Sequence, residues 1–183
     1  MNRKKWVVSE CDRDRAADIA ENCGIEPFAA LLLCARGLTD EFEVESFLFD
    51  TELIDPFTLP DMEKAINRLK IAIKNGEKIL IYGDYDVDGI TSTAILYKFI
   101  SEQGGDVSYY IPNRFDDGYG INILALQNIR KDGANLLVTV DCGITAVGEV
   151  EFAKSIGLDV IITDHHTCKD VRTGRRCEAD GIC

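Results

Sequence analysis

The feature that most constrains the fold is an alternation of short apolar runs and longer amphipathic segments from residue 78 onward. Short apolar runs bounded by turn residues are typical of buried strands, and helical spacing fills the segments between them. The expected strands are 79–82, 107–111, 135–140 and 158–163, and the expected helices are 90–103, 122–131 and 145–156. Strands that alternate with helices form parallel sheets with right-handed crossovers. The sequence therefore predicts an α/β fold, a parallel Rossmann-like sheet with flanking helices.

A small helical segment precedes this pattern. Residues 12–23, 27–36 and 42–49 have helix-forming composition, and a connector with two prolines follows. Asp61 then opens a further amphipathic helix, which its side chain can cap. We therefore expect three parts: a helical N-terminal segment with its connector, a sheet domain and a polar tail without regular structure. Their expected ranges are 1–60, 61–168 and 169–183.

Composition and charge exclude several classes of protein. The net charge of −12 argues against a surface that binds nucleic acid everywhere, although a local basic channel remains compatible with it. No apolar run is long enough to cross a bilayer and no signal sequence is evident, so we expect no membrane partner and a cytoplasmic location. The seven cysteines form no CxxC pair, which favours reduced thiols over a zinc ribbon.

An acidic cluster follows the first expected strand. Asp84, Asp86 and Asp88 alternate, so an extended backbone would place all three carboxylates on one face. Such a charge density is costly unless hard cations lie between the carboxylates. Gly89 then permits a tight turn into a helix, whose start at Thr91 and Ser92 offers N–H groups to a phosphate. The alternative is a helix cap beside a solvated acidic turn.

Two further strand ends repeat this plan. Asp141 follows one apolar run, and Asp164, His165 and His166 follow the next; these are the only histidines of the chain. Neighbouring strand ends in a parallel sheet lie about 4.8 Å apart, so ligands from several strands can converge. Mixed carboxylate and imidazole ligands favour manganese, with magnesium as the second candidate. A metal-activated water would then be the nucleophile on phosphorus.

The loop after the second expected strand carries a candidate phosphate contact. Arg114 could clamp a phosphate, and Phe115 or Tyr119 could stack on bases. The alternative is that the aromatic rings belong to the core and Arg114 pairs with Asp116 or Asp117.

These motifs resemble those of the DHH phosphoesterase superfamily. The resemblance rests on Asp84-Tyr85-Asp86-Val87-Asp88-Gly89, Val140-Asp141-Cys142-Gly143 and Asp164-His165-His166. The segment from Asp55-Pro56 to Ala65 and the segment from Ile111-Pro112-Asn113-Arg114 to Gly120 are similar to the RecJ branch, which comprises single-strand-specific exonucleases that work from 5′ to 3′. The resemblance covers about residues 45 to 168.

The resemblance implies a role for each motif residue. It makes Asp86, Asp88, Asp141 and His165 metal ligands, places His166 at the scissile phosphate and makes Asp84 a supporting member of the acidic cluster. Asp164 would orient the motif. One or two Mn²⁺ or Mg²⁺ ions are the implied cofactors, and phosphodiester hydrolysis is the implied reaction. Single-stranded DNA is the implied partner, with other DNA-repair and recombination proteins beyond it.

The chain departs from the family pattern in two ways, which keep other functions open. Tyr82 stands where many members have a histidine, and a phenol is a poor ligand at neutral pH. The family also continues beyond its DHH motif with a further aspartate motif and a second nucleic-acid-binding domain, so we expect a truncated form with weak or no activity alone. The alternatives are a phosphatase or phosphodiesterase of small substrates, such as pyrophosphate or a short oligonucleotide, and a non-catalytic metal-binding remnant. The oligomeric state stays open.

Overall fold

The structure is a computed structural model that describes residues 7, 9–50, 53–113, 120–167 and 181–182. The chain forms two compact units, residues 1–54 and 55–183. In the first unit, the side chains of Asp12 and Asp40 accept hydrogen bonds from the N–H groups that begin two of the helices. Buried side chains from all three helices, among them Ile19, Leu33 and Val44, form its core. The helices are α1 (Arg13–Asn22), α2 (Pro27–Cys34) and α3 (Glu41–Phe49).

The second unit is an α/β domain built on one parallel sheet, which confirms the predicted fold class. The spatial order of its strands is β2-β1-β3-β4-β5, and every pair is parallel. The strands are β1 (Ile79–Gly83), β2 (Val107–Tyr110), β3 (Leu136–Val140), β4 (Asp159–Thr163) and β5 (Gly181–Ile182). The helices are η1 (Pro56–Thr58), α4 (Met62–Asn75), α5 (Val87–Glu102), α6 (Ile123–Lys131) and α7 (Val147–Ser155).

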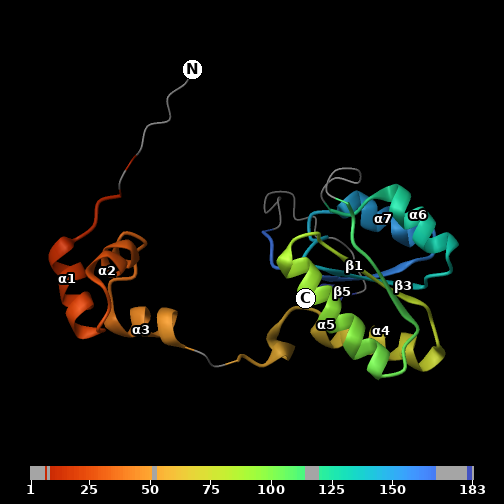
Figure 1. The fold of residues 1–183 in the computed structure, drawn as a ribbon, viewed down its shortest axis with the longest axis horizontal. Helices are drawn as coiled ribbons and strands as arrows, with labels where there is room; N and C mark the ends of the chain where they lie inside the picture. Colours follow the sequence, from red (N-terminus) through yellow and green to blue (C-terminus); the bar gives the residue numbers. More distant parts are fainter. Residues whose placement is uncertain (1–6, 8, 51–52, 114–119, 168–180, 183) are drawn as a thin grey trace, which may run out of the picture. The chain divides into compact units, whose positions relative to one another are not determined.

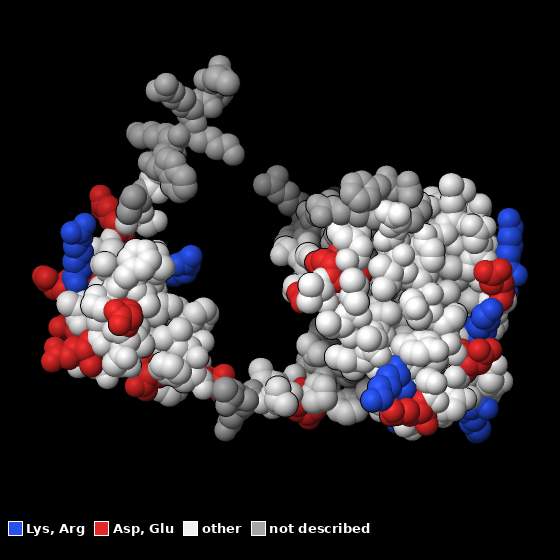
Figure 2. Space-filling view, in the orientation of Figure 1, with Lys and Arg blue, Asp and Glu red and all other residues white. Residues whose placement is uncertain are grey.

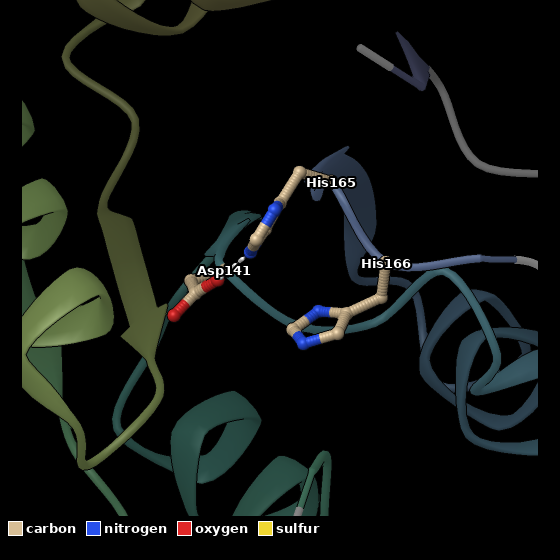
Figure 3. A group of neighbouring side chains, drawn as sticks. All are labelled: Asp141, His165 and His166. Carbon is tan, nitrogen blue, oxygen red and sulfur yellow. Dashed lines mark ion pairs between the residues drawn. The ribbon is translucent and has the colours of Figure 1, made fainter. Parts of the chain in front are cut away.

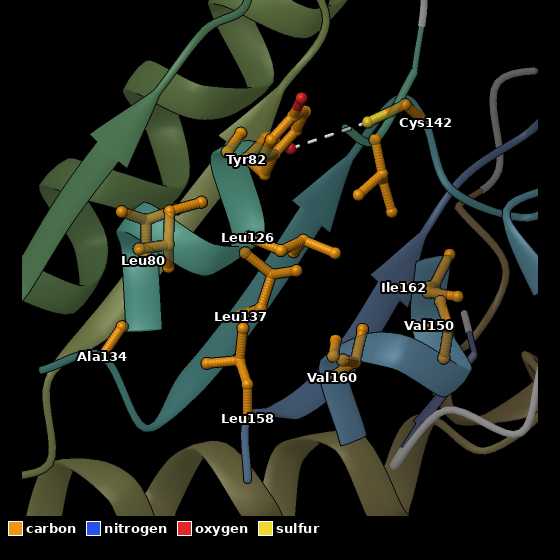
Figure 4. Packing of buried hydrophobic residues seen from close by; sticks show 14 residues of the cluster. Leu80, Tyr82, Leu126, Ala134, Leu137, Cys142, Val150, Leu158, Val160 and Ile162 are labelled. Atoms are coloured by element: carbon orange, nitrogen blue, oxygen red, sulfur yellow. Dashed lines mark hydrogen bonds between the residues drawn. The ribbon is translucent and has the colours of Figure 1, made fainter. Parts of the chain in front are cut away.

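Alternate side chains of the central strands enter two separate cores, as a strand with both faces covered requires. Ile79 and Ile81 of β1 belong to the core that also holds residues of α4 and α5. Leu80 and Tyr82 belong to the opposite core, with residues of α6 and α7. Figure 1 shows α4 and α5 on one side of the sheet and α6 and α7 on the other, and Figure 4 shows part of the second core. The domain therefore has three layers.

The strand order places the three sequence motifs side by side. The connection from β1 leads to β2 on one side, whereas β3 and β4 lie on the other, so the direction of chain progression reverses beside β1. Open α/β sheets bind their ligands at such a reversal, outside the carboxyl ends of the strands. Asp84, Asp141 and Asp164 follow the three neighbouring strands β1, β3 and β4 at this edge.

Three details differ from the expectations. The units divide after Ile54 rather than after residue 60, because η1 lies against α4 and so belongs to the sheet domain. The predicted cap at Asp61 is wrong, since its backbone is left-handed (φ 56°) and its side chain makes no cap hydrogen bond. The tail, expected to lack regular structure, contributes β5 beside β4, while residues 168–180 lie outside the described part. Within the described residues, no helix is both long and apolar enough to cross a membrane.

Candidate metal centre at the carboxyl edge of the sheet

Helix α5 begins at Val87, within the first motif, which is earlier than the alternating carboxylates suggest. Asp84 is buried directly after β1, at 3% exposure, whereas Asp86 is the N-cap of α5 and Asp88 lies in the first turn of that helix. The prediction that Asp84, Asp86 and Asp88 share one face of an extended backbone is therefore wrong. The Asp86 carboxylate accepts hydrogen bonds from the N–H groups of Asp88 and Gly89, which the helix leaves without partners. The Gly89 N–H, more than the other contacts, lowers the pKa of Asp86.

The early start of α5 also changes the roles expected of Gly89, Thr91 and Ser92. Gly89 is needed for packing rather than for a turn, since a Cβ there would lie 2.6 Å from the backbone nitrogen of Asp84. Thr91 and Ser92 lie in the second turn, and the N–H of Ile90 before them already donates to the Asp86 carbonyl. The prediction that the helix begins near Thr91 and offers its N–H groups to a phosphate is therefore wrong. The Thr91 hydroxyl instead donates to the Val87 carbonyl, at 2.7 Å.

Asp141 is held in an unusual backbone conformation between β3 and the following loop. Its φ of 61° lies in the left-handed region, which residues other than glycine rarely adopt, although Asp does so more often than most. Its N–H donates to the Thr163 carbonyl of β4 at 2.9 Å, so the turn is tied to the neighbouring strand. Burial and the nearby carboxylate of Asp86 raise the pKa of Asp141. Two carboxyl groups crowded in this way favour a bound cation.

The two histidines approach the buried carboxylates from β4. The Nε2 atom of His165 lies 3.0 Å from Oδ1 of Asp141, a contact drawn in Figure 3. His166 takes a different partner: its Nδ1 lies 2.7 Å from Oδ1 of Asp164, and its backbone N–H donates to the same oxygen. The other oxygen of Asp164 accepts the N–H of Ile144. Asp164 thus orients His166 and ties the second and third motifs together.

These side chains form two groups that could hold a metal ion. One consists of Asp84, Asp86 and Asp141, the other of Asp141, His165 and His166, and the potential ligand atoms of each group lie within 4.8 Å of one another. Within the described residues, Oδ1 of Asp84 is buried without a hydrogen-bond partner. A buried carboxylate oxygen normally has a partner, so this orphaned oxygen and the mixed donor set both fit a divalent cation.

The remaining predicted residues surround this centre. Asp88, Thr91 and Ser92 line a pocket of about 350 Å³ together with Asp141 and His165. Asp88 belongs to neither potential ligand group of the described residues, so its predicted role as a ligand rests on the sequence alone. Arg114 lies outside the described residues.

Tyr82, where a histidine was expected from the family pattern, belongs to the core of the sheet domain. Its side chain is fully buried, and its hydroxyl donates to the Gly120 carbonyl at 3.0 Å. Its ring packs against Tyr110 of β2, with 5.2 Å between centroids. The phenol therefore serves the core and the loop at Gly120.

Charge is unevenly distributed over the sheet domain. Basic residues occupy the last turns of α4, α6 and α7, namely Lys74, Arg130, Lys131 and Lys154. In a parallel α/β domain these helix ends lie at the edge opposite the carboxyl ends of the strands. In Figure 2, the blue side chains of this domain accordingly lie away from the start of α5. Among described residues, the pocket at the metal-type cluster is lined by acidic, histidine, hydroxyl and valine side chains and by no Lys or Arg.

The comparison with known families decides where the chain belongs. The model described as "DHH family, N-terminal domain" matches residues 78–178, which is more than half of the chain. The chain belongs to the DHH family. The expected resemblance is confirmed, and the three motifs at the carboxyl edge, called DHH motifs below, lie within the matched residues.

Curated DHH relatives extend the likeness into the N-terminal unit. A protein of Bacillus subtilis named single-stranded-DNA-specific exonuclease RecJ is 42% identical over 167 residues, which is 90% of this chain and 21% of that protein. The protein of that name from Thermus thermophilus is 39% identical over 171 residues, which is 91% of this chain and 24% of that protein. The chain therefore spans about a fifth to a quarter of the length of these relatives.

Two solved DHH structures share the fold. A RecJ exonuclease bound to manganese is 38% identical with a TM-score of 0.58, over 62% of this chain and 29% of that one. RecJ from Thermus thermophilus in complex with Mn²⁺ is 28% identical with a TM-score of 0.60, over 95% of this chain and 24% of that one. Both neighbours hold the ion that the mixed ligand set of this chain favours.

The hydrogen bond within the DHH motif predicts the titration of His166. The carboxylate of Asp164 raises the pKa of His166, because it accepts the Nδ1 proton and stabilises the imidazolium. The pKa of Asp164 is lowered despite its burial, since the N–H groups of Ile144 and His166 favour its ionised form. In Asp164→Asn, we expect the pKa of His166 to fall, so that the ring loses its proton at a lower pH.

This titration can be followed by NMR on the Cε1 proton of each histidine in metal-free protein. An unchanged midpoint for His166 in the variant would contradict the assigned contact.

Sequence reasoning missed two residues of the DHH centre. Val140 and Thr163 line the same pocket as Asp141 and His165. Each is the last residue of its strand, directly before the aspartate of a motif. That position is the available signal: Val140 stands in the second motif without a predicted role at the site, and Thr163 is predicted only as the end of a strand.

Proposed function

We propose that this chain carries the metal centre of a RecJ-type phosphodiesterase that hydrolyses single-stranded DNA from the 5′ end. The observation that carries the proposal is the convergence of all three DHH motifs on the carboxyl ends of β1, β3 and β4. The names of the curated relatives supply the substrate class, since both are called single-stranded-DNA-specific exonucleases. Because the chain spans at most a quarter of these relatives, the proposal concerns the site and the class of reaction. Cytoplasmic DNA repair and recombination is the proposed setting.

We assign some residues of the site to cation binding and others to the phosphate of the substrate. Asp86, Asp141 and His165 would hold Mn²⁺ or Mg²⁺, with Asp84 offering its orphaned oxygen and Asp88 a further carboxylate at the pocket wall. When bound, such a cation supplies Lewis acidity and lowers the pKa of a water molecule.

His166 is suited to the phosphate. Its raised pKa favours the imidazolium, and because Asp164 accepts the Nδ1 proton, the second ring nitrogen can donate to a phosphate oxygen. Thr91 and Ser92 line the pocket at Asp141 and His165, where Ser92 could add a hydroxyl contact to the phosphate. The Thr91 hydroxyl donates to the Val87 carbonyl and would have to exchange that bond for one to the phosphate. Arg114, outside the described residues, remains a proposed phosphate clamp.

The first test measures Mn²⁺ binding by the purified chain. Electron paramagnetic resonance reports the concentration of free Mn²⁺ during the titration. Asp86→Asn tests the metal-ligand role specifically. Asparagine caps a helix as well as aspartate does, so the substitution removes the negative charge and keeps the cap. We expect binding in the wild type and a loss of affinity in the variant. A wild-type chain that binds no Mn²⁺ would overturn the proposal.

The second test separates His166 from the metal ligands. We expect His166→Ala to abolish Mn²⁺-dependent release of mononucleotides from 5′-phosphorylated single-stranded DNA, while the affinity for Mn²⁺ falls much less than in Asp141→Asn. The wild-type rate is expected to be low, because the described pocket offers no Lys or Arg to the substrate. Equal losses of hydrolysis and metal binding would instead assign His166 to the ligand set, which its place in the second group permits.

The same assay tests the alternative substrates. Pyrophosphate and a dinucleotide replace the long single strand at equal phosphate concentration. Faster hydrolysis of either would favour a small-substrate phosphoesterase, and Mn²⁺ binding without hydrolysis of any substrate would favour a non-catalytic metal-binding protein.

A further inference from the structure

The left-handed backbone of Asp141 needs support from its surroundings. Left-handed conformations of residues other than glycine persist only where neighbouring groups fix them. Asp141 belongs to both potential ligand groups, so the position of its carboxylate affects both. The contacts that hold the loop from Asp141 to Ile144 therefore matter for the proposed metal centre.

Two contacts hold the ends of this loop. The N–H of Asp141 donates to the Thr163 carbonyl, and the N–H of Ile144 donates to the carboxylate of Asp164 at 3.0 Å. Both partners come from β4 or from the residue directly after it. The loop is thus tied at each end to the neighbouring strand.

Thr139 of β3 contacts the middle of the Asp141 to Ile144 loop. Its side chain is fully buried, and its hydroxyl donates to the Cys142 carbonyl at 2.7 Å. A Cβ at Gly143 would lie 2.9 Å from this hydroxyl oxygen, so the loop folds closely around it. The Thr139 carbonyl in turn accepts the Thr163 hydroxyl at 2.7 Å, which links the support to β4.

A contact from β1 completes the support. The buried Cys142 thiol donates to the Tyr82 carbonyl at 3.7 Å, drawn as the dashed line in Figure 4. Burial raises the pKa of Cys142 to about 12, so this sulfur stays a thiol and serves as a donor rather than as a metal ligand.

We propose that Thr139 is a positioning residue, whose hydroxyl holds the Asp141 to Ile144 loop so that the Asp141 carboxylate faces the metal-type cluster. The consequence for metal affinity rests on the proposed function, whereas the consequence for the loop does not. A threonine suits this place because its β-branched side chain has few rotamers on a strand, which fixes the hydroxyl under the loop.

Three variants test the proposal. Thr139→Val keeps the shape and removes the hydroxyl, and Thr139→Ser keeps the hydroxyl and removes a methyl group. Leu137→Ala is the matched control, because Leu137 is fully buried two residues earlier on the same face of β3 and makes no part of the loop. It lowers stability without touching the loop.

The first readout is amide hydrogen exchange in metal-free protein. In Thr139→Val, we expect the Asp141 and Ile144 amides to exchange about fivefold faster or more relative to the Val138 amide, as the loss of one hydrogen bond would bring. Thr139→Ser and Leu137→Ala should keep the wild-type ratio. Unchanged ratios in Thr139→Val would overturn the proposal, whether or not the chain binds a metal.

The second readout is Mn²⁺ affinity by titration. We expect it to fall about 10- to 100-fold in Thr139→Val, the usual effect of losing a residue that orients a ligand, and to stay near the wild-type value in the other two variants. Faster exchange with unchanged Mn²⁺ affinity would overturn the positioning role at the metal. Absence of binding in the wild type would instead reject the proposed function, while the exchange data still decide the role in the loop.

Discussion

Gly89→Ala is expected to destabilise the sheet domain by about 3 kcal/mol, at the upper end of what overpacking usually costs. The added Cβ would press against the backbone of Asp84, which follows a central strand and cannot move as a side-chain tip could. Relief requires the start of α5 to shift away from β1, and that shift separates Asp84 from Asp86. We therefore expect the variant also to lose Mn²⁺ binding, under conditions in which it is still folded.

Gly148→Ala is the control for this prediction. Gly148 lies in the first turn of α7, and a Cβ there meets nothing within 4 Å. Alanine should therefore stabilise the protein by about 0.4–1 kcal/mol through its lower conformational entropy in the unfolded chain. Urea denaturation of both variants measures the contrast. Equal effects of the two substitutions would show that α5 does not pack on Asp84 in this way.

Asp141→Asn is expected to have opposite effects on the metal-bound and the metal-free protein. It removes a carboxylate shared by both potential ligand groups, so Mn²⁺ affinity should fall by a factor of about 100 or more. In EDTA the same change relieves the repulsion between Asp141 and Asp86, and asparagine adopts left-handed backbone readily. We expect the Tm of the metal-free protein to rise by about 2–4 °C, the shift that 1 kcal/mol gives in a protein of this size.

Differential scanning calorimetry with EDTA and with Mn²⁺ measures both effects. Asp132→Asn, an exposed aspartate at the end of α6, is the matched control and should change neither quantity. A lower Tm of Asp141→Asn in EDTA would show that the Asp141 carboxylate stabilises the metal-free fold instead of straining it. Unchanged Mn²⁺ affinity would remove Asp141 from the ligand set.

The fold could be predicted because local and global signals agree along the sheet domain. The run at 79–82 is apolar at every position and the strand at 136–140 at every position but Thr139, as strands with two covered faces require, and glycines mark several helix ends. The same logic placed Asp84, Asp141 and Asp164 at one edge, because the carboxyl ends of parallel strands meet there. The convergence of the motifs thus followed from periodicity and topology.

The details that could not be predicted are details of backbone geometry. In such places the sequence carries two conflicting signals, or none, for the local conformation. The alternation of Asp84, Asp86 and Asp88 suggested an extended segment, but Asp86 caps a helix, and its hydrogen bonds to Asp88 and Gly89 begin α5 earlier. The left-handed conformations of Asp61 and Asp141 leave no mark in composition. Thr139 reads as an ordinary strand residue, because only the three-dimensional loop shows what its hydroxyl contacts.

The placement of the motifs on three neighbouring strands makes a bound cation a reversible cross-link. Asp84 and Asp141 of one potential ligand group lie far apart in the sequence, and so do Asp141 and His165 of the other. An ion in each group would therefore close a long loop of the chain, which an unfolded chain closes only at an entropic cost. Folding and metal occupancy are therefore linked equilibria, and once the site is saturated each tenfold rise in free cation adds about 1.4 kcal/mol to the unfolding free energy. If the proposed centre binds a cation, the cation concentration therefore sets the stability of the fold.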